Sequence, residues 1–388
     1  EKNQISDSAS LKIVDRSNEY PSNNSIYKDV KTPIIDRVLD LLSYMTLEEK
    51  VGQMTQVGRQ FLKQEKDISD YFLGSLLSAG AAPSPNTPES WAMMYDGYQN
   101  IALSTRLGIP LIYGIDAIHG HNNVIGATIF PHQIGLGCTD NPKLIEDVYR
   151  ATAIEVAATG IDWNFAPNLG VARDERWGRT YECFGETAEI VSKMAEASVK
   201  GLQSSSLGQT TSILACAKHF VGDGETIWGT GLNGKLDQGD ARLSKEQLSQ
   251  IHMQGFLKAI NQGVGTIMPA YNMVNGKYCH SRKDLLTNLL KEDLNFDGFL
   301  ISDWRALEKI GSNYKENIIK SINAGVDMVM VPGAENWGGE KYTTFISLLI
   351  ESVNEELISI SRINDAVARI LKIKFQMGLF EKPFSNKI

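Results

Sequence analysis

The sequence has few cysteines and no long apolar run. Its four cysteines stand far apart and form no CxxC pair of the kind that ligates metals, so we expect buried free thiols. No apolar stretch approaches the roughly 18 residues that a membrane-spanning helix needs. Because 42% of the residues are hydrophobic and 22% are charged, the composition is that of a globular protein with a large core. We predict no membrane span.

Positive charge is also scarce. The chain has 38 Lys and Arg against 46 Asp and Glu, which gives a net charge of -8. Binding of phosphates calls for a basic stripe, and no dense cluster of Lys or Arg is present. This argues against a nucleic-acid partner and favours a neutral ligand. The chain begins at Glu1 rather than Met, which suggests either a trimmed chain or a removed signal peptide. On the second of these alternatives we expect a secreted or periplasmic protein.

Short apolar runs alternate with amphipathic stretches along most of the chain. Strand-helix alternation of this kind predicts a parallel sheet with right-handed crossovers. Eight such units, within 388 residues, predict an α/β fold of the (β/α)8 TIM-barrel type. The apolar runs lie near residues 52–58, 74–80, 111–116, 160–166, 213–219, 265–271, 298–303 and 326–331. Helical patterns cover residues 143–158, 188–202, 245–262, 316–324 and 361–377, and Thr46 to Glu49 has the form of a capping box.

The domain organisation follows from these patterns. Residues 1–31 are polar and lack periodicity, so we expect an N-terminal arm that lies over the body of the protein. Residues 32–378 form the predicted barrel. We interpret residues 379–388 as a tail or as the start of a linker to a further C-terminal domain.

Polar side chains stand where several of the predicted strands end. The run Phe299-Leu300-Ile301 stops at Ser302-Asp303-Trp304, which sets a carboxylate beside an aromatic ring. In a barrel of this kind, the C-terminal ends of the strands form the active-site face. The other candidates at that face are Asp116, Lys218, His219, Met268 and Tyr271.

This set of side chains suits a sugar. Asp116 can accept hydrogen bonds from two neighbouring hydroxyls, while Lys218, His219 and Arg179 donate. Trp304 can stack on the apolar face of the sugar ring. Taken singly, each residue also has a plainer interpretation: Asp303 as a helix cap, Asp116 as a turn residue, Arg179 as a surface ion pair and Trp304 as core.

Four motifs together resemble glycoside hydrolase family 3. They are GIDAIHGH at residues 114–121, RWGR at 176–179, KHFVGDG at 218–224 and SDW at 302–304. The resemblance covers about residues 38–383 and is closest to exo-acting β-glucosidases and β-glucan exohydrolases. It implies a retaining enzyme that releases glucose from the non-reducing ends of β-glucosides or β-glucan oligosaccharides, without a cofactor or metal. Asp303 would be the nucleophile. The terminal sugar would be held by Asp116, Arg179, Lys218, His219, Met268, Tyr271 and Trp304.

The acid/base residue is the missing part of this interpretation. A retaining glycosidase needs a second carboxyl about 5 to 5.5 Å from the nucleophile. In the two-domain members that the chain resembles, this acid is a Glu on a following α/β sandwich domain. The single-domain members use a His in the loop after the Lys-His pair, but this chain has no His between Phe220 and Ile251. Glu225 is the candidate substitute, and a solvated loop residue is its alternative interpretation.

Two other functions remain open from the sequence. A barrel without its acid would bind sugars with little turnover. A metal-dependent amidohydrolase-like barrel is the other alternative, because the pair His119 and His121, with Lys218, His219 and Asp303, is similar to the ligand set of those enzymes. There the His-x-His pair ends the first strand, whereas here it follows the third predicted strand. Histidines that only hold loops together are the plainer interpretation of His119, His121 and His132.

Overall fold

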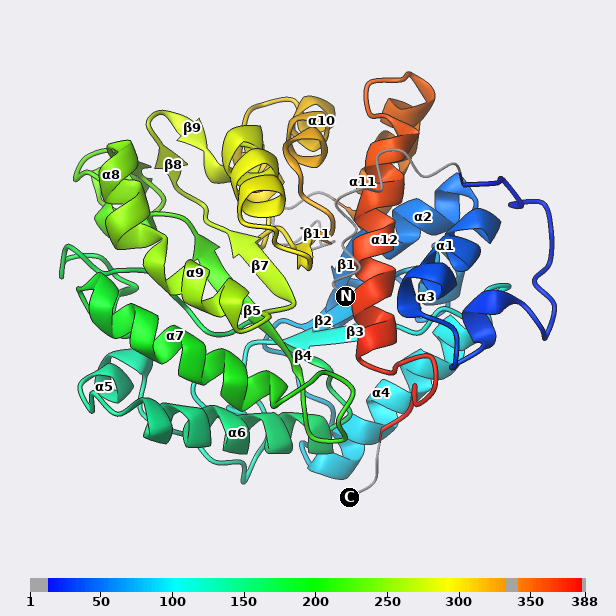
Figure 1. Ribbon diagram of the computed structural model, residues 1–388, viewed down its shortest axis with the longest axis horizontal. Coiled ribbons are helices and arrows are strands. Elements are labelled where there is room, and N and C mark those ends of the chain that lie inside the picture. The colour runs from blue at the N-terminus through cyan, green and yellow to red at the C-terminus, as the bar shows by residue number, and fades with distance from the viewer. Residues whose placement is uncertain (1–12, 332–340, 386–388) are drawn as a thin grey trace.

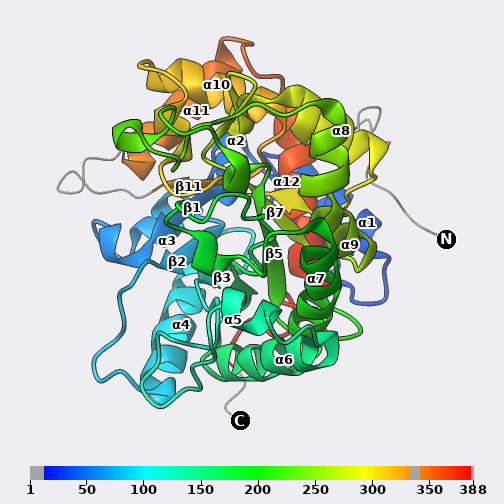
Figure 2. The ribbon, with the colours of Figure 1, turned by 90° about the vertical axis from the view of Figure 1, so that its left-hand side faces the viewer.

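The main sheet forms where the apolar runs predict it. The computed structural model describes residues 13–331 and 341–385, and its main sheet has eight strands in the order β10-β7-β5-β4-β3-β2-β1-β11. Neighbouring strands are parallel, and a bridge between Ile301 and Met328 joins the ends of that order, so the sheet closes. Helices surround the strands in both views (Figure 1, Figure 2). The predicted (β/α)8 barrel is confirmed. Its strands are β1 (Thr55–Gly58), β2 (Ser75–Ser78), β3 (Ile112–Ile115), β4 (Trp163–Asn164), β5 (Leu214–Phe220), β7 (Thr266–Pro269), β10 (Phe299–Leu300) and β11 (Val329–Val331).

Most of the predicted helices are also present, with one interruption. The pattern over residues 245–262 becomes α8 and α9 separated by a π-helical segment, Leu248–His252. The capping box opens α2: the Glu49 backbone N–H donates to Thr46 Oγ1 and the Thr46 N–H donates to Glu49 Oε2. The α-helices are α1 (Ile34–Tyr44), α2 (Leu47–Gln53), α3 (Asp67–Asp70), α4 (Pro88–Leu103), α5 (Gln133–Gly137), α6 (Pro142–Ala158), α7 (Ala188–Gln203), α8 (Lys245–Gln247), α9 (Gln254–Asn261), α10 (Tyr314–Ala324), α11 (Tyr342–Asn354) and α12 (Ile360–Gln376).

Aromatic side chains fill part of the barrel core. The ring of Trp163 on β4 lies 4.9 Å from that of Phe165 and 5.3 Å from that of Phe299 on β10, centroid to centroid. Its indole N–H donates to Thr266 Oγ1 on β7 at 3.0 Å. The Phe165 ring fills the space beside Gly114, where a Cβ would lie 2.3 Å from Cζ of that ring. The glycine that opens the GIDAIHGH motif therefore has a packing role.

A small second sheet forms from the loops after β5 and β7. Its strands are β6 (Asp240–Ala241), β8 (Met273–Val274) and β9 (Lys277–Tyr278), with β6 and β8 parallel and β8 and β9 antiparallel. A short 3-10 helix, Cys279–Ser281, follows β9 directly. This sheet matters for the site because it carries the chain from the end of β7 back towards the barrel.

The predicted ends of the barrel are only partly described. Residues 13–31 include a short 3-10 helix, Ile26–Lys28, and the carbonyl of buried Tyr27 accepts from Arg37 Nε at 2.8 Å. At the other end, the Ser385 N–H donates to Asp96 Oδ1 on α4 at 2.7 Å. Residues 1–12 and 386–388 lie outside the described residues, so the limits of the arm and the tail stay predictions. Within residues 13–331 and 341–385, no helix combines the length and the apolar character that a membrane crossing demands.

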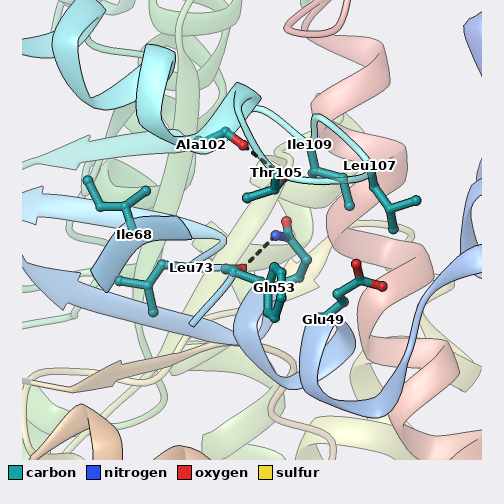
Figure 3. A pocket seen from close by; sticks show the side chains of 9 residues that line it. Glu49, Gln53, Ile68, Leu73, Ala102, Thr105, Leu107 and Ile109 are labelled. Atoms are coloured by element: carbon teal, nitrogen blue, oxygen red, sulfur yellow. Dashed lines mark hydrogen bonds between the residues drawn. The ribbon is translucent and has the colours of Figure 1, made fainter. Parts of the chain in front are cut away.

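The cavity shown in Figure 3 lies at the opposite end of the barrel from the predicted site. Gln53, Leu73 and Ile109, which line it, each precede a strand rather than follow one. Its volume of about 10 Å³ has room for one water molecule at most. The Gln53 amide crosses it and donates to the Phe72 carbonyl at 2.9 Å. This end of a barrel serves stability, and we assign no ligand to the cavity.

Candidate active site

The structure brings most of the predicted site residues together in two adjacent groups. Lys218 Nζ on β5 donates to Asp116 Oδ1, just after β3, at 3.0 Å. The next residue, His219, has its Nε2 at 3.1 Å from Arg179 Nη2 and 3.8 Å from Asp303 Oδ2. These side chains come from four separate places in the chain. They meet because parallel strands bring their C-terminal ends to one face.

Asp303 is buried and only half satisfied by hydrogen bonds. Its Oδ1 accepts from the Trp304 backbone N–H at 2.6 Å. Its Oδ2 is buried and accepts no hydrogen bond of good geometry within the described part of the chain, because the nearby Tyr271 hydroxyl donates to the Trp304 carbonyl instead. Burial raises the pKa of this carboxyl above its ordinary value, and the positive charges of Arg179 and Lys218 oppose that rise. Oδ2 is therefore the oxygen of this carboxylate that stays available for a further contact.

His219 has a defined tautomer. Its Nδ1 lies 3.1 Å from Asp223 Oδ2 and must carry the hydrogen, while its Nε2 accepts from Arg179. Burial, reinforced by the charges of Arg179 and Lys218, holds the pKa of His219 well below its ordinary value. The ring is thus neutral, and its Nε2 is an acceptor. The donor hydrogen of His219 is directed at Asp223 in this hydrogen-bond pattern, so donation from His219 to a sugar stays a prediction.

Arg179 is fixed by a carboxylate rather than exposed on the surface. Its Nε and Nη2 donate to the two oxygens of Glu182, at 2.8 and 2.7 Å. Such a bidentate pair sets the plane of the guanidinium. The carboxylate also keeps the pKa of Arg179 above its ordinary value although burial acts in the other direction. Asp223 lies beyond His219, and burial raises the pKa of its carboxyl to about 7.

Tyr271 and Trp304 stand beside the nucleophile candidate. The Tyr271 hydroxyl donates to the Trp304 backbone carbonyl. The Trp304 ring is half-buried and lies 5.7 Å from the ring of Phe61, which follows β1. Met268 on β7 is buried and pairs in register with Lys218 on β5. All the sugar-binding residues predicted from the sequence therefore lie at this end of the barrel.

Glu225 is held by a histidine. Its Oε2 lies 2.7 Å from Nε2 of buried His252 and 3.9 Å from Arg173 Nε. His252 ends the π-helical segment, 27 residues further along the chain. The Glu225 side chain is 28% exposed, so it is partly solvated and also has a buried partner.

The histidines of the metal interpretation face protein partners. His119 Nδ1 lies 2.7 Å from the Phe130 carbonyl, and its ring centroid is 4.1 Å from that of His132. His121 Nε2 pairs with Thr159 Oγ1 at 3.1 Å. Among residues 13–331 and 341–385, no group of three or more His, Cys, Asp or Glu is arranged to hold a metal ion.

Sequence reasoning misses several residues that hold the site in place. Glu182 fixes Arg179, Asp223 fixes His219, and His280 accepts a hydrogen bond from the backbone of Asp303 at 3.1 Å. Asp223 lies inside the KHFVGDG motif, so its position after the strand was a usable signal. Glu182 stands three residues after Arg179, a spacing that permits a local ion pair. For His280 the sequence contains no comparable signal.

The comparisons with known proteins place the chain in a family. The family model for the glycosyl hydrolase family 3 N-terminal domain matches residues 46–373. The chain belongs to glycosyl hydrolase family 3. The site just described lies within that N-terminal domain.

Relatives of this family 3 chain are similar over nearly all of its length. A lysosomal β-glucosidase of Dictyostelium discoideum is 33% identical over 377 residues, covering 89% of this chain and 44% of the relative. A periplasmic β-glucosidase of Salmonella typhimurium is 30% identical, covering 90% of this chain and 43% of the relative. The crystal structure of an exo-1,3/1,4-β-glucanase from a Pseudoalteromonas species is 38% identical with a TM-score of 0.83, covering 96% of this chain and 45% of that one. This family 3 chain therefore spans less than half the length of these relatives.

Replacing Arg179 by Gln is expected to shift the pH dependence of this family 3 site. The guanidinium lowers the pKa of both Asp303 and Asp223, so its removal raises both. If activity needs ionised Asp303, the acid limb of the pH–activity profile then moves to higher pH. The measurement is the pH profile of kcat/KM on an aryl β-glucoside for wild type and R179Q. An acid limb that stays in place would show that Arg179 does not act on an ionisation that controls activity.

Proposed function

We propose that this chain is the catalytic barrel of a retaining exo-β-glucosidase or β-glucan exohydrolase that releases glucose from non-reducing ends. The observation that carries the proposal is the carboxylate of Asp303, with Oδ1 held by the Trp304 N–H and Oδ2 buried without a hydrogen bond of good geometry among the described residues. A carboxylate in this state is suited to attack a sugar carbon. Family membership and the β-glucosidase and exo-glucanase names of the relatives support β-glucosides as the substrate class.

The proposed reaction has two steps. Asp303 Oδ2 attacks the anomeric carbon, an ester bond forms, and the bond to the leaving oxygen breaks with its electron pair. A general acid protonates that oxygen. Water then attacks the same carbon, the acid residue now acts as base, and the carboxylate is released with glucose. Asp116 would accept from sugar hydroxyls, Lys218 and Arg179 would donate, and Trp304 would stack on the ring.

Other carboxylates near Asp303 already have partners within the barrel, which favours a general acid from outside the barrel. Asp116 is paired with Lys218, Glu182 with Arg179 and Asp223 with His219. Glu225 is paired with His252, although it stays the candidate within the barrel. We therefore propose that a C-terminal α/β sandwich domain supplies the acid, which accords with a chain that covers 44% of a β-glucosidase relative. The periplasmic relative supports a secreted or periplasmic location.

Comparing two leaving groups tests the proposal. An aryl β-glucoside has a good leaving group that needs little help from an acid, whereas an alkyl β-glucoside or a disaccharide needs much. We expect this chain to release aryl glucosides at least about 10²-fold faster than alkyl glucosides, in the range that general acid catalysis contributes. Activity on neither substrate, with binding of glucose retained, would instead support a sugar-binding barrel with little turnover.

Equal activity on both substrates would place an acid within the chain. The Glu225→Gln variant then tests whether Glu225 is that acid. If Glu225 is the acid, E225Q loses turnover of the alkyl glucoside and keeps that of the aryl glucoside. Full activity of E225Q on both would exclude it from that role.

A further inference from the structure

His280 binds the backbone of the reacting residue directly. Its ring is buried, with Nε2 at 3.1 Å from the Asp303 N–H and Nδ1 at 3.1 Å from the Ala270 carbonyl. An amide N–H can only donate and a carbonyl can only accept. The ring must therefore be neutral, with its hydrogen on Nδ1 and its lone pair on Nε2. Protonation of Nε2 would place its N–H against the N–H of Asp303.

The location of His280 explains why one ring can make both contacts. It lies in the 3-10 helix Cys279–Ser281, which follows the small sheet and returns the chain to the barrel. Ala270 follows β7 and Asp303 follows β10, and these two strands are neighbours in the barrel. The imidazole thus links the C-terminal ends of two adjacent strands.

A second link runs beside the first. Tyr271, the residue after Ala270, donates its hydroxyl to the carbonyl of Trp304, the residue after Asp303. Residues 303 and 304 are therefore each connected to the end of β7, one through the His280 ring and one through the Tyr271 hydroxyl. The two links hold the peptide units on either side of the Asp303–Trp304 peptide, so they restrict both translation and rotation of the backbone that carries the carboxylate.

We propose that His280 is a positioning residue, which holds the backbone of Asp303 so that Oδ2 is presented to the anomeric carbon. This inference rests on the proposed function, because it assumes attack by Asp303. Oδ1 accepts from the Trp304 N–H, so the orientation of the carboxylate depends on the same backbone that His280 holds. A displacement of about 1 Å at a reacting atom costs on the order of 10²-fold in rate, even when the sugar still binds.

Covalent labelling separates this role from general support of the fold. The probe is an activated aryl 2-deoxy-2-fluoro-β-glucoside: Asp303 Oδ2 bonds to the anomeric carbon, the aryloxide leaves with its electron pair, and the fluorine slows hydrolysis of the ester. Intact-protein mass gives the limiting labelling rate and the half-saturating probe concentration. We expect His280→Phe, which keeps a ring but has no acceptor, to lower the limiting rate by about 10²-fold. The half-saturating concentration should change by less than about three-fold, because substrate-binding side chains are untouched.

Two further variants complete the test. His280→Gln can still offer an oxygen to the Asp303 N–H and should recover at least about ten-fold of the lost rate, in keeping with partial restoration of orientation. The matched control is His121→Phe, because His121 is also buried but pairs with Thr159. It should label at the wild-type rate even if its thermal midpoint falls. Labelling of H280F at the wild-type rate overturns the inference, whereas no labelling of wild type at Asp303 overturns the proposed function and this inference with it.

A measurement on the wild-type protein covers the case in which H280F does not fold. With 15N-labelled histidine, the Nε2 of His280 should resonate as an unprotonated acceptor. It should shift when the probe esterifies Asp303, because the amide to which it is bonded belongs to that residue. A protonated Nε2, or an Nε2 resonance that does not respond to esterification, would overturn the inference.

Discussion

Replacing Asp303 by Asn is expected to lower the turnover of an aryl β-glucoside by at least about 10³-fold, within the range that deletion of a nucleophile produces. The amide has the same shape but cannot form the ester intermediate. The aryl substrate is the right one for this test, because its turnover does not depend on the acid that the barrel is proposed to lack. The measurement is kcat/KM for wild type and D303N at a pH where the wild-type carboxylate is ionised.

The same substitution is expected to preserve or raise the stability of the fold. Burial raises the pKa of Asp303 in the folded state above its ordinary value of 3.8. The folded state therefore binds more protons than the unfolded state between 3.8 and the raised value, so the stability of wild type falls as the pH rises through that window. An Asn side chain carries no charge, so D303N avoids this loss. Its thermal midpoint at neutral pH should equal or exceed that of wild type, and the difference should vanish below about pH 3.8.

Asp162→Asn is the matched control for D303N. Asp162 is another largely buried carboxyl, whose pKa burial raises to about 7, but it precedes β4 and so lies at the opposite end of the barrel. It accepts from the Tyr113 N–H at 3.0 Å and from the Tyr95 hydroxyl at 3.1 Å. We expect D162N to keep wild-type activity. If D303N stays within about ten-fold of wild type, Asp303 is not the nucleophile and the proposed mechanism fails.

The barrel and the location of its site could be predicted because they depend on local patterns. Each apolar run corresponds to one strand, and the polar residue that ends a run, such as Asp116 or Asp303, lies at the C-terminal end of that strand. The residue pattern of the strands, together with the rule that active sites occupy the C-terminal end of a barrel, is enough to place these residues at the site. The identity of the nucleophile candidate comes from the same reasoning together with the resemblance in the SDW motif.

The contacts that orient the site could not be predicted, because they join residues that are distant in the sequence. His280 contacts Asp303 across 23 residues and reaches it only through the path of the small sheet. His252 contacts Glu225 across 27 residues, and it ends a π-helical segment that interrupts a pattern predicting one continuous helix. The acceptor role of His219 depends on both Arg179 and Asp223, and no spacing along the chain specifies a tautomer.

Replacing Lys374 by Met is expected to lower the free energy of unfolding by about 2–4 kcal/mol, because it removes the donor to Gln53 Oε1 and to the Pro110 carbonyl and one of the two donors to the Gly74 carbonyl. Lys374 lies on α12 and is fully buried. Its Nζ donates to Gln53 Oε1 at 2.7 Å, to the Gly74 carbonyl at 2.8 Å and to the Pro110 carbonyl at 2.7 Å. These acceptors precede β1, β2 and β3, so one ammonium group ties three strand beginnings to the last helix. The measurement is urea unfolding of wild type and K374M at neutral pH.

The effect should also depend on pH in a defined direction. Burial lowers the pKa of Lys374 from 10.5 to about 7, against the opposing effect of Asp162. Between these values the unfolded state binds more protons than the folded state, so the stability of wild type relative to K374M rises as the pH increases from about 7 towards 10.5.

Lys372→Met is the matched control for K374M, on the same helix and with the same change of side chain. Lys372 pairs with Asp297, whose side chain is 38% exposed, so this ion pair is partly screened by solvent. Its loss should cost no more than about 1 kcal/mol, as is typical of pairs open to solvent. If K374M and K372M unfold at the same urea concentration, the three hydrogen bonds of Lys374 contribute no more than one partly exposed ion pair. The beginnings of β1, β2 and β3 would then be held by the packing of their apolar side chains rather than by this ammonium group.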